Sequence, residues 1–256
     1  MIKRMVPSAV FAGLAAGLLA ALLHFAFVQK LILLGEDYET GAMVHFGGVT
    51  AHDHADHDHG ATEPAMPDPL APNPTAPAGH QHSHAPDEDA GPLQRNALSV
   101  LFFVVTYVSY GLILAAGFGL ADSMGKTIGL REGLLWGIAG FVAFQLAPAM
   151  GLQPELPGTM AADLSARALW WWGTAFATAG GLALIGYGKG LPAYGAAILL
   201  LALPHIIGAP ELEGYTGVAP PELAAAFAAR GLGVGLAVWA VLGALTGYFW
   251  SRPTTA

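Results

Sequence analysis

The chain has 256 residues, of which 54% are apolar and only 11% are charged, and its formal net charge is −8. Globular proteins average about 25% charged residues, so this composition excludes an ordinary soluble domain and indicates an integral membrane protein. Cysteine is absent, which excludes disulfides, thiolate ligands and thiol nucleophiles, so any metal ion must be bound by nitrogen and oxygen atoms. The acidic balance gives no indication of a nucleic-acid surface.

Six apolar segments approach or exceed the roughly 20 residues that a helix needs to cross a bilayer. They are residues 6–29, 96–120, 130–151, 166–187, 191–208 and 226–250. We therefore predict an all-α integral membrane bundle of about six transmembrane helices. The first segment follows Lys3 and Arg4 as a signal peptide would, but it is long and no small-x-small cleavage site follows, so we expect it to be retained. The predicted division is a first helix with its outer interface (1–39), a polar insert (40–94) and a five-helix membrane bundle (95–256).

The charged residues between these segments predict the topology. With six spans, one side receives Lys3, Arg4, Lys126, Arg131, Lys189 and Arg252. The positive-inside rule assigns that side to the cytoplasm, together with both termini. Only Asp122 and Glu132 of the 18 acidic residues fall there. The insert is then external, in the periplasm if the membrane is a bacterial inner membrane, on a face whose acidic charge attracts cations.

Eight of the ten histidines lie in or beside the polar insert. They are His45, His52, His54, His57, His59, His80, His82 and His84. Imidazole is a common ligand of Zn, Ni, Co and Cu ions, and the His-x-His spacing places two rings on one side of an extended chain. The insert is rich in proline and is predicted to be disordered. We expect all of these histidines except His45 to capture metal ions with little selectivity; the alternative is a solvated linker whose histidines are incidental.

A few polar residues fall near or within the predicted spans. His24 lies in the first span, Gln145 one turn before Pro148 in the third, and His205 directly after Pro204, which we expect to interrupt the fifth helix. Ionisable groups at this depth are rare and usually face a bundle interior. The functional interpretation places His24, Gln145 and His205 around an outward-facing metal passage, with Glu36, Glu155 and Glu211 at its mouth. The alternative is structural hydrogen bonding between helices.

The last two hairpins resemble each other. Pro148-x5-Pro154-Glu155 is followed by Arg167, and Pro204-x5-Pro210-Glu211 is followed by Arg230. Glu36 and Arg95 match the pattern loosely in the first hairpin. We predict a parallel repeat of helical hairpins, a known way of building transporters, although acids and arginines are also common at membrane interfaces. Arg167 and Arg230 are expected to pair with nearby acids or with lipid phosphate, the acids being Glu155, Asp163, Glu211 and Glu222.

Small residues and tryptophans in the predicted spans indicate how the helices pack and where the membrane interface lies. The pairs Gly13-x3-Gly17, Gly133-x3-Gly137 and Gly243-x3-Gly247 predict close contacts between helices. The run Trp170-Trp171-Trp172 is interpreted as part of an aromatic belt at the outer interface rather than a binding site.

Several segments together resemble the CbtA family of predicted cobalt transporter subunits. They are Leu31 to Glu39, the His/Asp insert, Phe144 to Gly158, Trp170 to Thr174 and Leu203 to Pro210. The resemblance implies cobalt supply, often for cobalamin synthesis, and a small single-span partner, CbtB. Members of the family are usually described with about five spans, whereas we count six.

The predicted function is membrane uptake of a divalent transition metal, first of all Co2+, with Ni2+ and Zn2+ as further candidates. The metal ion is cargo, and no tightly bound cofactor is expected. No Gly-x4-Gly-Lys-Ser/Thr motif and no His-Glu-x-x-His motif is present, so we expect neither ATP hydrolysis nor metalloenzyme activity. The alternative is a non-transporting accessory subunit that senses metal or delivers it to another permease.

Overall fold

The computed structural model describes residues 2–45, 91–212, 214 and 217–252. These residues contain helices and connecting segments but no strand, and six of the helices are long and apolar enough to cross a membrane. The elements are α1 (Ile2–Leu23), η1 (His24–Val28), α2 (Gln29–Glu39), α3 (Pro92–Ser123), α4 (Leu130–Phe141), η2 (Val142–Leu146), α5 (Ala147–Ala149), α6 (Leu164–Tyr187), α7 (Gly190–Ile207) and α8 (Pro221–Trp250). The prediction of an all-α membrane bundle with six spans is confirmed.

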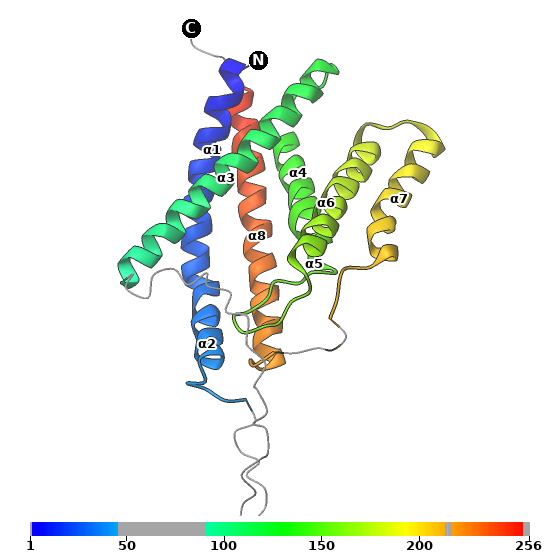
Figure 1. Cartoon of the computed structure of the whole chain (residues 1–256). Helices are drawn as coiled ribbons and strands as arrows, with labels where there is room; N and C mark the ends of the chain where they lie inside the picture. Colours follow the sequence, from blue (N-terminus) through cyan, green and yellow to red (C-terminus); the bar gives the residue numbers. More distant parts are fainter. Residues whose placement is uncertain (1, 46–90, 213, 215–216, 253–256) are drawn as a thin grey trace, which may run out of the picture.

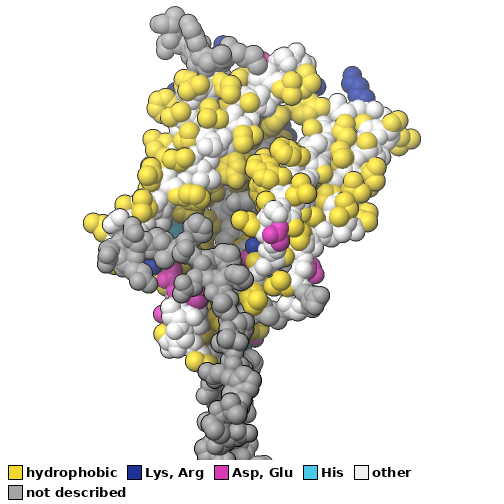
Figure 2. Space-filling model, viewed as in Figure 1, with side chains coloured by type: hydrophobic (Ala, Val, Ile, Leu, Met, Phe, Trp, Pro, Cys, Tyr) yellow, Lys and Arg dark blue, Asp and Glu magenta, His cyan; other side chains and the backbone are white. Residues whose placement is uncertain are grey.

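The two ends of the bundle differ in what they carry. The start of α1 and the end of α8 lie together at one end, which we call the termini end (Figure 1). The end of α2 and the start of α3, between which the insert is attached, lie towards the opposite end, which we call the insert end. Apolar side chains cover much of the helix surface, and the visible acidic side chains lie mostly towards the insert end (Figure 2).

The first helical rod is longer than the sequence pattern indicates. The segments α1, η1 and α2 follow one another without a break, so the rod ends at Glu39, ten residues beyond the predicted span. Helix α3 begins at Pro92, two residues before the predicted end of the insert at residue 94. Proline suits the first position of a helix because its missing N–H would have no partner there.

Glycine pairs determine how α4 packs on α8. A Cβ atom added at Gly133 would lie 2.8 Å from the Gly247 Cα, and one added at Gly137 would lie 2.9 Å from the Gly243 Cα. Real side chains do not approach backbone this closely, so only glycine allows the two helices their contact. Gly17 makes a similar close contact with the backbone of α3 at Val104. The predicted role of the small-residue pairs is confirmed.

The helices form two groups. Helices α1, α3, α4 and α8 make one group around a core that includes Phe118, Val238, Trp239 and Leu242, all fully buried. Helices α6 and α7 form an antiparallel hairpin at one side of this group (Figure 1). The hairpin is joined to the rest mainly where α6 contacts η2 and α5. The groups therefore meet closely near the insert end.

Two helix ends at the insert end have clear chemical causes. The Asp163 side chain accepts a hydrogen bond from the Ala166 N–H at 3.0 Å and caps α6. Hydrogen bonds from the Ser165 hydroxyl and from that N–H hold the pKa of Asp163 below its usual value. Helix α7 ends at Ile207, and the next residue, Gly208, has a φ of 86° that suits glycine.

The expected interruption at Pro204 is wrong. Helix α7 continues through Pro204 to Ile207. The Pro204 carbonyl accepts from the Gly208 N–H at 3.0 Å and from the Trp170 indole N–H at 3.1 Å. One proline near the C-terminal end of a helix removes a single backbone hydrogen bond, and the last turn can still form around it.

Candidate functional site

Two of the three polar residues predicted to line a passage lie in π-helical turns. His24 opens η1, and Gln145 lies in η2. Both turns contact α8. A π-helical turn is rare, widens the backbone locally and occurs often at functional sites. The second one has a visible cause, because it directly precedes Pro148, which cannot donate to the backbone ladder.

Gln145 is the most unusual polar residue of the membrane region. Its Oε1 atom is buried and has no hydrogen-bond partner within the described ranges. The side chain lies directly against Gly235 of α8, and it also lies next to the Tyr107 hydroxyl of α3. A buried acceptor without a partner costs about 1–3 kcal/mol, and a group that bound this oxygen would remove that cost.

Gln145 lines a cavity of about 310 Å³. The cavity lies between η2, the segment that follows α5, Trp171 of α6 and the Gly231 region of α8. Pro154 forms part of its wall, and the next residue along the chain is Glu155. These elements meet where the α6–α7 hairpin joins the larger group. The cavity therefore lies at this junction, near the insert end of the bundle.

Aromatic rings separate this cavity from the rest of the core. The Phe144 ring stacks on Trp239, with centroids 5.9 Å apart and planes at 12°, and its centroid lies 6.1 Å from that of Trp171. Tyr110 packs on Trp239 at 4.6 Å. The indole N–H of Trp239 is buried and, like the Gln145 oxygen, has no partner in the described part of the chain.

Each of the first two hairpins carries an ion pair between the acid and the arginine of its sequence pattern. Arg167 pairs with Glu155 at 2.8 Å, and Arg95 pairs with Glu36 at 3.4 Å. The first pair is the more shielded, with side-chain exposures of 23% for Arg167 and 34% for Glu155. The Glu36–Arg95 pair joins the two chain segments that flank the insert.

Arg230 differs from the other two arginines. It donates to the Phe27 carbonyl of η1 at 3.3 Å and forms no ion pair with an acid among the described residues. The expected pairing with Glu211 or Glu222 is therefore not found. Glu211 is exposed at the insert end, beyond α7.

His205 belongs to the α6–α7 contact. Its ring meets the Trp170 ring edge-on, with centroids 6.1 Å apart. Trp170 and Trp171 both lie between helices, whereas Trp172 is 49% exposed. The aromatic-belt interpretation thus fits the exposure of Trp172, while its two neighbours make internal contacts.

His24 has a mainly aromatic environment. It is half-buried, and its ring lies 5.1 Å from Phe103 of α3 and 5.7 Å from Phe25, measured between centroids. It therefore reaches α3 from the α1 rod, whereas Gln145 reaches α8 from the α4 side.

The predicted site residues are only partly brought together. Gln145 and the chain segment that carries Glu155 share the 310 Å³ cavity, and His205 contacts Trp170, the neighbour of the cavity residue Trp171. Within the described ranges, no three His, Asp or Glu side chains form a group that could hold a metal ion. The remaining predicted ligands His52, His54, His57, His59, His80, His82 and His84 lie outside the described residues.

Sequence reasoning missed the groups that surround Gln145. Tyr107, Trp171 and Gly235 come from three helices, and nothing in their spacing links them to one another. The pair Gly231-x3-Gly235 in α8 is a local signal, because residues four apart share one helix face and two glycines leave that face open to another group.

Comparison with known proteins yields one match. Residues 2–251 match the model of the CbtA family, described as a probable cobalt transporter subunit. No curated protein and no solved structure matches the chain. The match extends over nearly the whole length, and with it the chain belongs to the CbtA family.

Proposed function

We propose that this chain moves a divalent transition metal ion, with cobalt as the first candidate, across the membrane through the junction between the α6–α7 hairpin and α8. The observation that carries the proposal is that Gln145, whose buried Oε1 atom has no hydrogen-bond partner in the described part of the chain, also lines the 310 Å³ cavity. Membership of a family of probable cobalt transporter subunits supports cobalt as the cargo.

The side chains around the cavity suit this ion. The carbonyl oxygen of Gln145 and the carboxylate of Glu155 are oxygen ligands, and the His205 imidazole is a nitrogen ligand on the neighbouring α6–α7 contact. A mixed N/O set of this kind suits Co2+ and Ni2+, which bind imidazole and carboxylate. In this proposal Glu155 receives the ion at the insert end, and Gln145 contacts it further in, beside α8.

The histidine-rich insert has a separate role. It is attached between α2 and α3 near the Glu36–Arg95 pair, and therefore at the end where the cavity lies. Its histidines raise the local metal concentration and are not the transport site. Protonation of imidazole below its ordinary pKa of about 6.5 competes with metal, so capture should weaken as the pH falls through this value.

The direction of transport follows from the charge distribution. Among the described charged residues, Arg4, Lys126, Arg131, Lys189 and Arg252 come from the termini end, which the positive-inside rule assigns to the cytoplasm. The insert then faces outward, and the proposed process is uptake. In a bacterium this means a multi-pass inner-membrane protein with a periplasmic insert.

Metal flux into liposomes that contain only the purified chain tests this function. We expect Co2+ to accumulate faster than in empty liposomes, with Ni2+ and Zn2+ as competitors. If the folded protein gives no flux but delivers metal to another permease, the chain is an accessory subunit. The family resemblance implies a single-span partner, CbtB, which is added to the liposomes in a second experiment. Flux that appears only with CbtB means that the chain needs its partner, whereas flux absent in both experiments means that the chain does not transport.

A further inference from the structure

A second and larger cavity lies at the termini end. It measures about 630 Å³ and lies between α3, α4, α6 and the loop that joins α3 to α4. Its walls are mainly apolar, with Ile113 and Leu114 from α3, Leu135 from α4 and Leu182 from α6. Ile113 and Leu135 are 50% and 59% exposed, so the cavity opens sideways between the helices.

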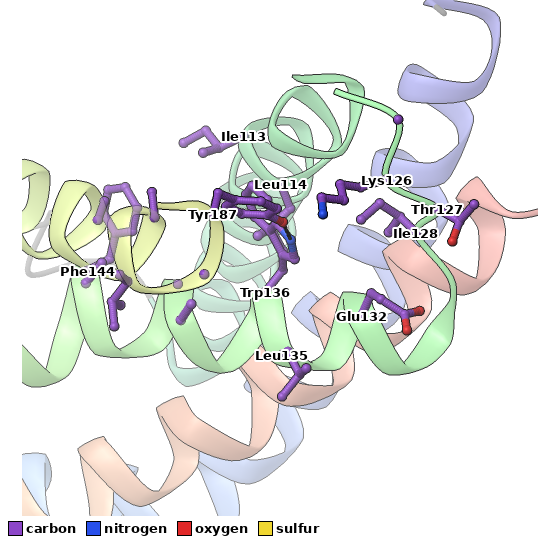
Figure 3. A pocket seen from close by; sticks show the side chains of 18 residues that line it. Ile113, Leu114, Lys126, Thr127, Ile128, Glu132, Leu135, Trp136, Phe144 and Tyr187 are labelled. Carbon is purple, nitrogen blue, oxygen red and sulfur yellow. Dashed lines mark hydrogen bonds between the residues drawn. The ribbon is translucent and has the colours of Figure 1, made fainter. Parts of the chain in front are cut away.

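Lys126 places a positive charge at the mouth of this cavity. Figure 3 shows the Lys126 side chain extending towards Trp136 and Tyr187. Lys126 forms no ion pair with any described residue. Glu132, the acid in the lining, is engaged elsewhere, because its carboxylate accepts from the Gly129 N–H at 3.0 Å.

A second polar group lies beside the lysine. The Trp136 indole N–H donates to the Tyr187 hydroxyl at 2.9 Å and joins α4 to α6. A hydroxyl that accepts one hydrogen bond keeps its own hydrogen to donate. Lys126 and Tyr187 therefore offer two donor groups above an apolar hollow.

The depth of the cavity decides what class of molecule it fits. Along α4 and η2 the lining runs from Glu132 to Phe144, which is twelve residues or about 18 Å at 1.5 Å per residue. The hydrocarbon core of a bilayer is about 30 Å thick. The cavity therefore extends through roughly one leaflet, which matches a lipid tail, whereas a spanning partner helix would need a groove of the full thickness.

We infer that this cavity binds an anionic phospholipid of the leaflet at the termini end. The tail lies against the apolar walls between α4 and α6, and the phosphate accepts from the Lys126 ammonium and the Tyr187 hydroxyl. One basic residue near an anionic lipid surface contributes about 1 kcal/mol, which corresponds to about a fivefold change in affinity. The bound lipid would fill the space between the α6–α7 hairpin and the larger helix group.

Lipid retention by the full chain tests this inference. The protein is purified in mild detergent, and the bound phosphatidylglycerol is measured by mass spectrometry. Lys126→Ala should retain about fivefold less of this lipid than the wild type. Lys189→Ala is the matched control, because Lys189 lies at the same end but does not line the cavity, and it should retain the wild-type amount. Equal retention by the two variants would overturn the inference.

A crosslinking experiment avoids any dependence on how well the lysine variant folds. A photoreactive amino acid at Ala183, which lines the cavity, is activated in cell membranes. An adduct with the mass of an anionic phospholipid supports the inference. A polypeptide adduct would mean that a partner protein occupies the cavity, and an adduct with zwitterionic lipid alone would remove the role of Lys126; either result overturns the proposal.

Discussion

The guanidinium of Arg230 donates to the backbone carbonyl of Phe27 at 3.3 Å, although 203 residues separate them in the chain. Phe27 lies in the π-helical turn η1, and Arg230 lies in α8 just before the glycine-rich face that Gln145 contacts. The contact connects the first helical rod to α8 near the proposed passage. The matching arginines Arg95 and Arg167 instead pair with acids in their own hairpins.

This contact predicts the effect of removing the guanidinium. Arg230→Met keeps most of the side-chain length and loses the donor, so we expect the free energy of unfolding to fall by about 1 kcal/mol. Thermal unfolding in detergent measures the change. Arg131→Met is the control, since Arg131 is exposed at the other end and forms no ion pair within the described chain. Equal destabilisation by both variants would refute a specific role for the Phe27 contact.

Two variants at the Glu155–Arg167 pair distinguish the effect of losing the ion pair from the effect of losing the carboxylate as a proposed metal ligand. Either Glu155→Gln or Arg167→Gln removes the pair, at a cost of about 1 kcal/mol or less for a partly exposed pair. Only Glu155→Gln also removes a negatively charged metal ligand. We expect cobalt uptake to fall more in Glu155→Gln than in Arg167→Gln at equal amounts of folded protein. Similar losses in both variants would assign Glu155 a structural role alone.

His205 lies beside Trp170 and offers a nitrogen ligand near the passage. His205→Ala should reduce cobalt uptake strongly without reducing the amount of folded protein. His205→Asn keeps a hydrogen-bonding group but is a weak metal ligand, so it should show a comparable loss. Trp170→Phe serves as the control for packing, because it removes the indole donor to Pro204 and keeps an aromatic ring. Near-normal uptake by His205→Asn would mean that His205 is structural.

The insert should affect the cobalt concentration needed for half-maximal uptake and not the maximal rate of uptake. Deleting residues 51–85 removes seven histidines, from His52 to His84. We expect the cobalt concentration for half-maximal uptake to rise and the maximal rate to stay close to that of the full chain. Loss of uptake at saturating cobalt, in folded protein, would contradict the division between capture and transport.

The sequence predicts the helices well because their causes are local. Apolar length indicates each span, and the pairs Gly133-x3-Gly137 and Gly243-x3-Gly247 indicate close packing, which the α4–α8 contact confirms. The Glu–Arg pattern of the hairpins likewise predicted the Glu155–Arg167 pair. The hairpin repeat itself stays a prediction.

The π-helical turns and the surroundings of Gln145 could not be predicted in this way. They depend on which helices meet, as in the approach of Gln145 to Gly235 and of Arg230 to Phe27. Pro204 was misinterpreted for a different reason. A proline near the end of a helix removes only the hydrogen bond to the carbonyl four residues earlier, and the last turn of α7 still forms.

The most direct test of the proposed passage compares alanine at two neighbouring glycines of α8. A Cβ atom at Gly235 would collide with the Gln145 amide, whereas one at Gly233 would meet no atom within 4 Å. Alanine forms helices better than glycine by about 1 kcal/mol, so neither change should weaken α8 itself. Cobalt uptake into proteoliposomes is measured for both variants and the wild type. We predict that Gly233→Ala transports normally, while Gly235→Ala displaces Gln145 and lowers the maximal rate about tenfold, which corresponds to about 1.4 kcal/mol. Equal, undiminished uptake by both folded variants would contradict a passage at Gln145.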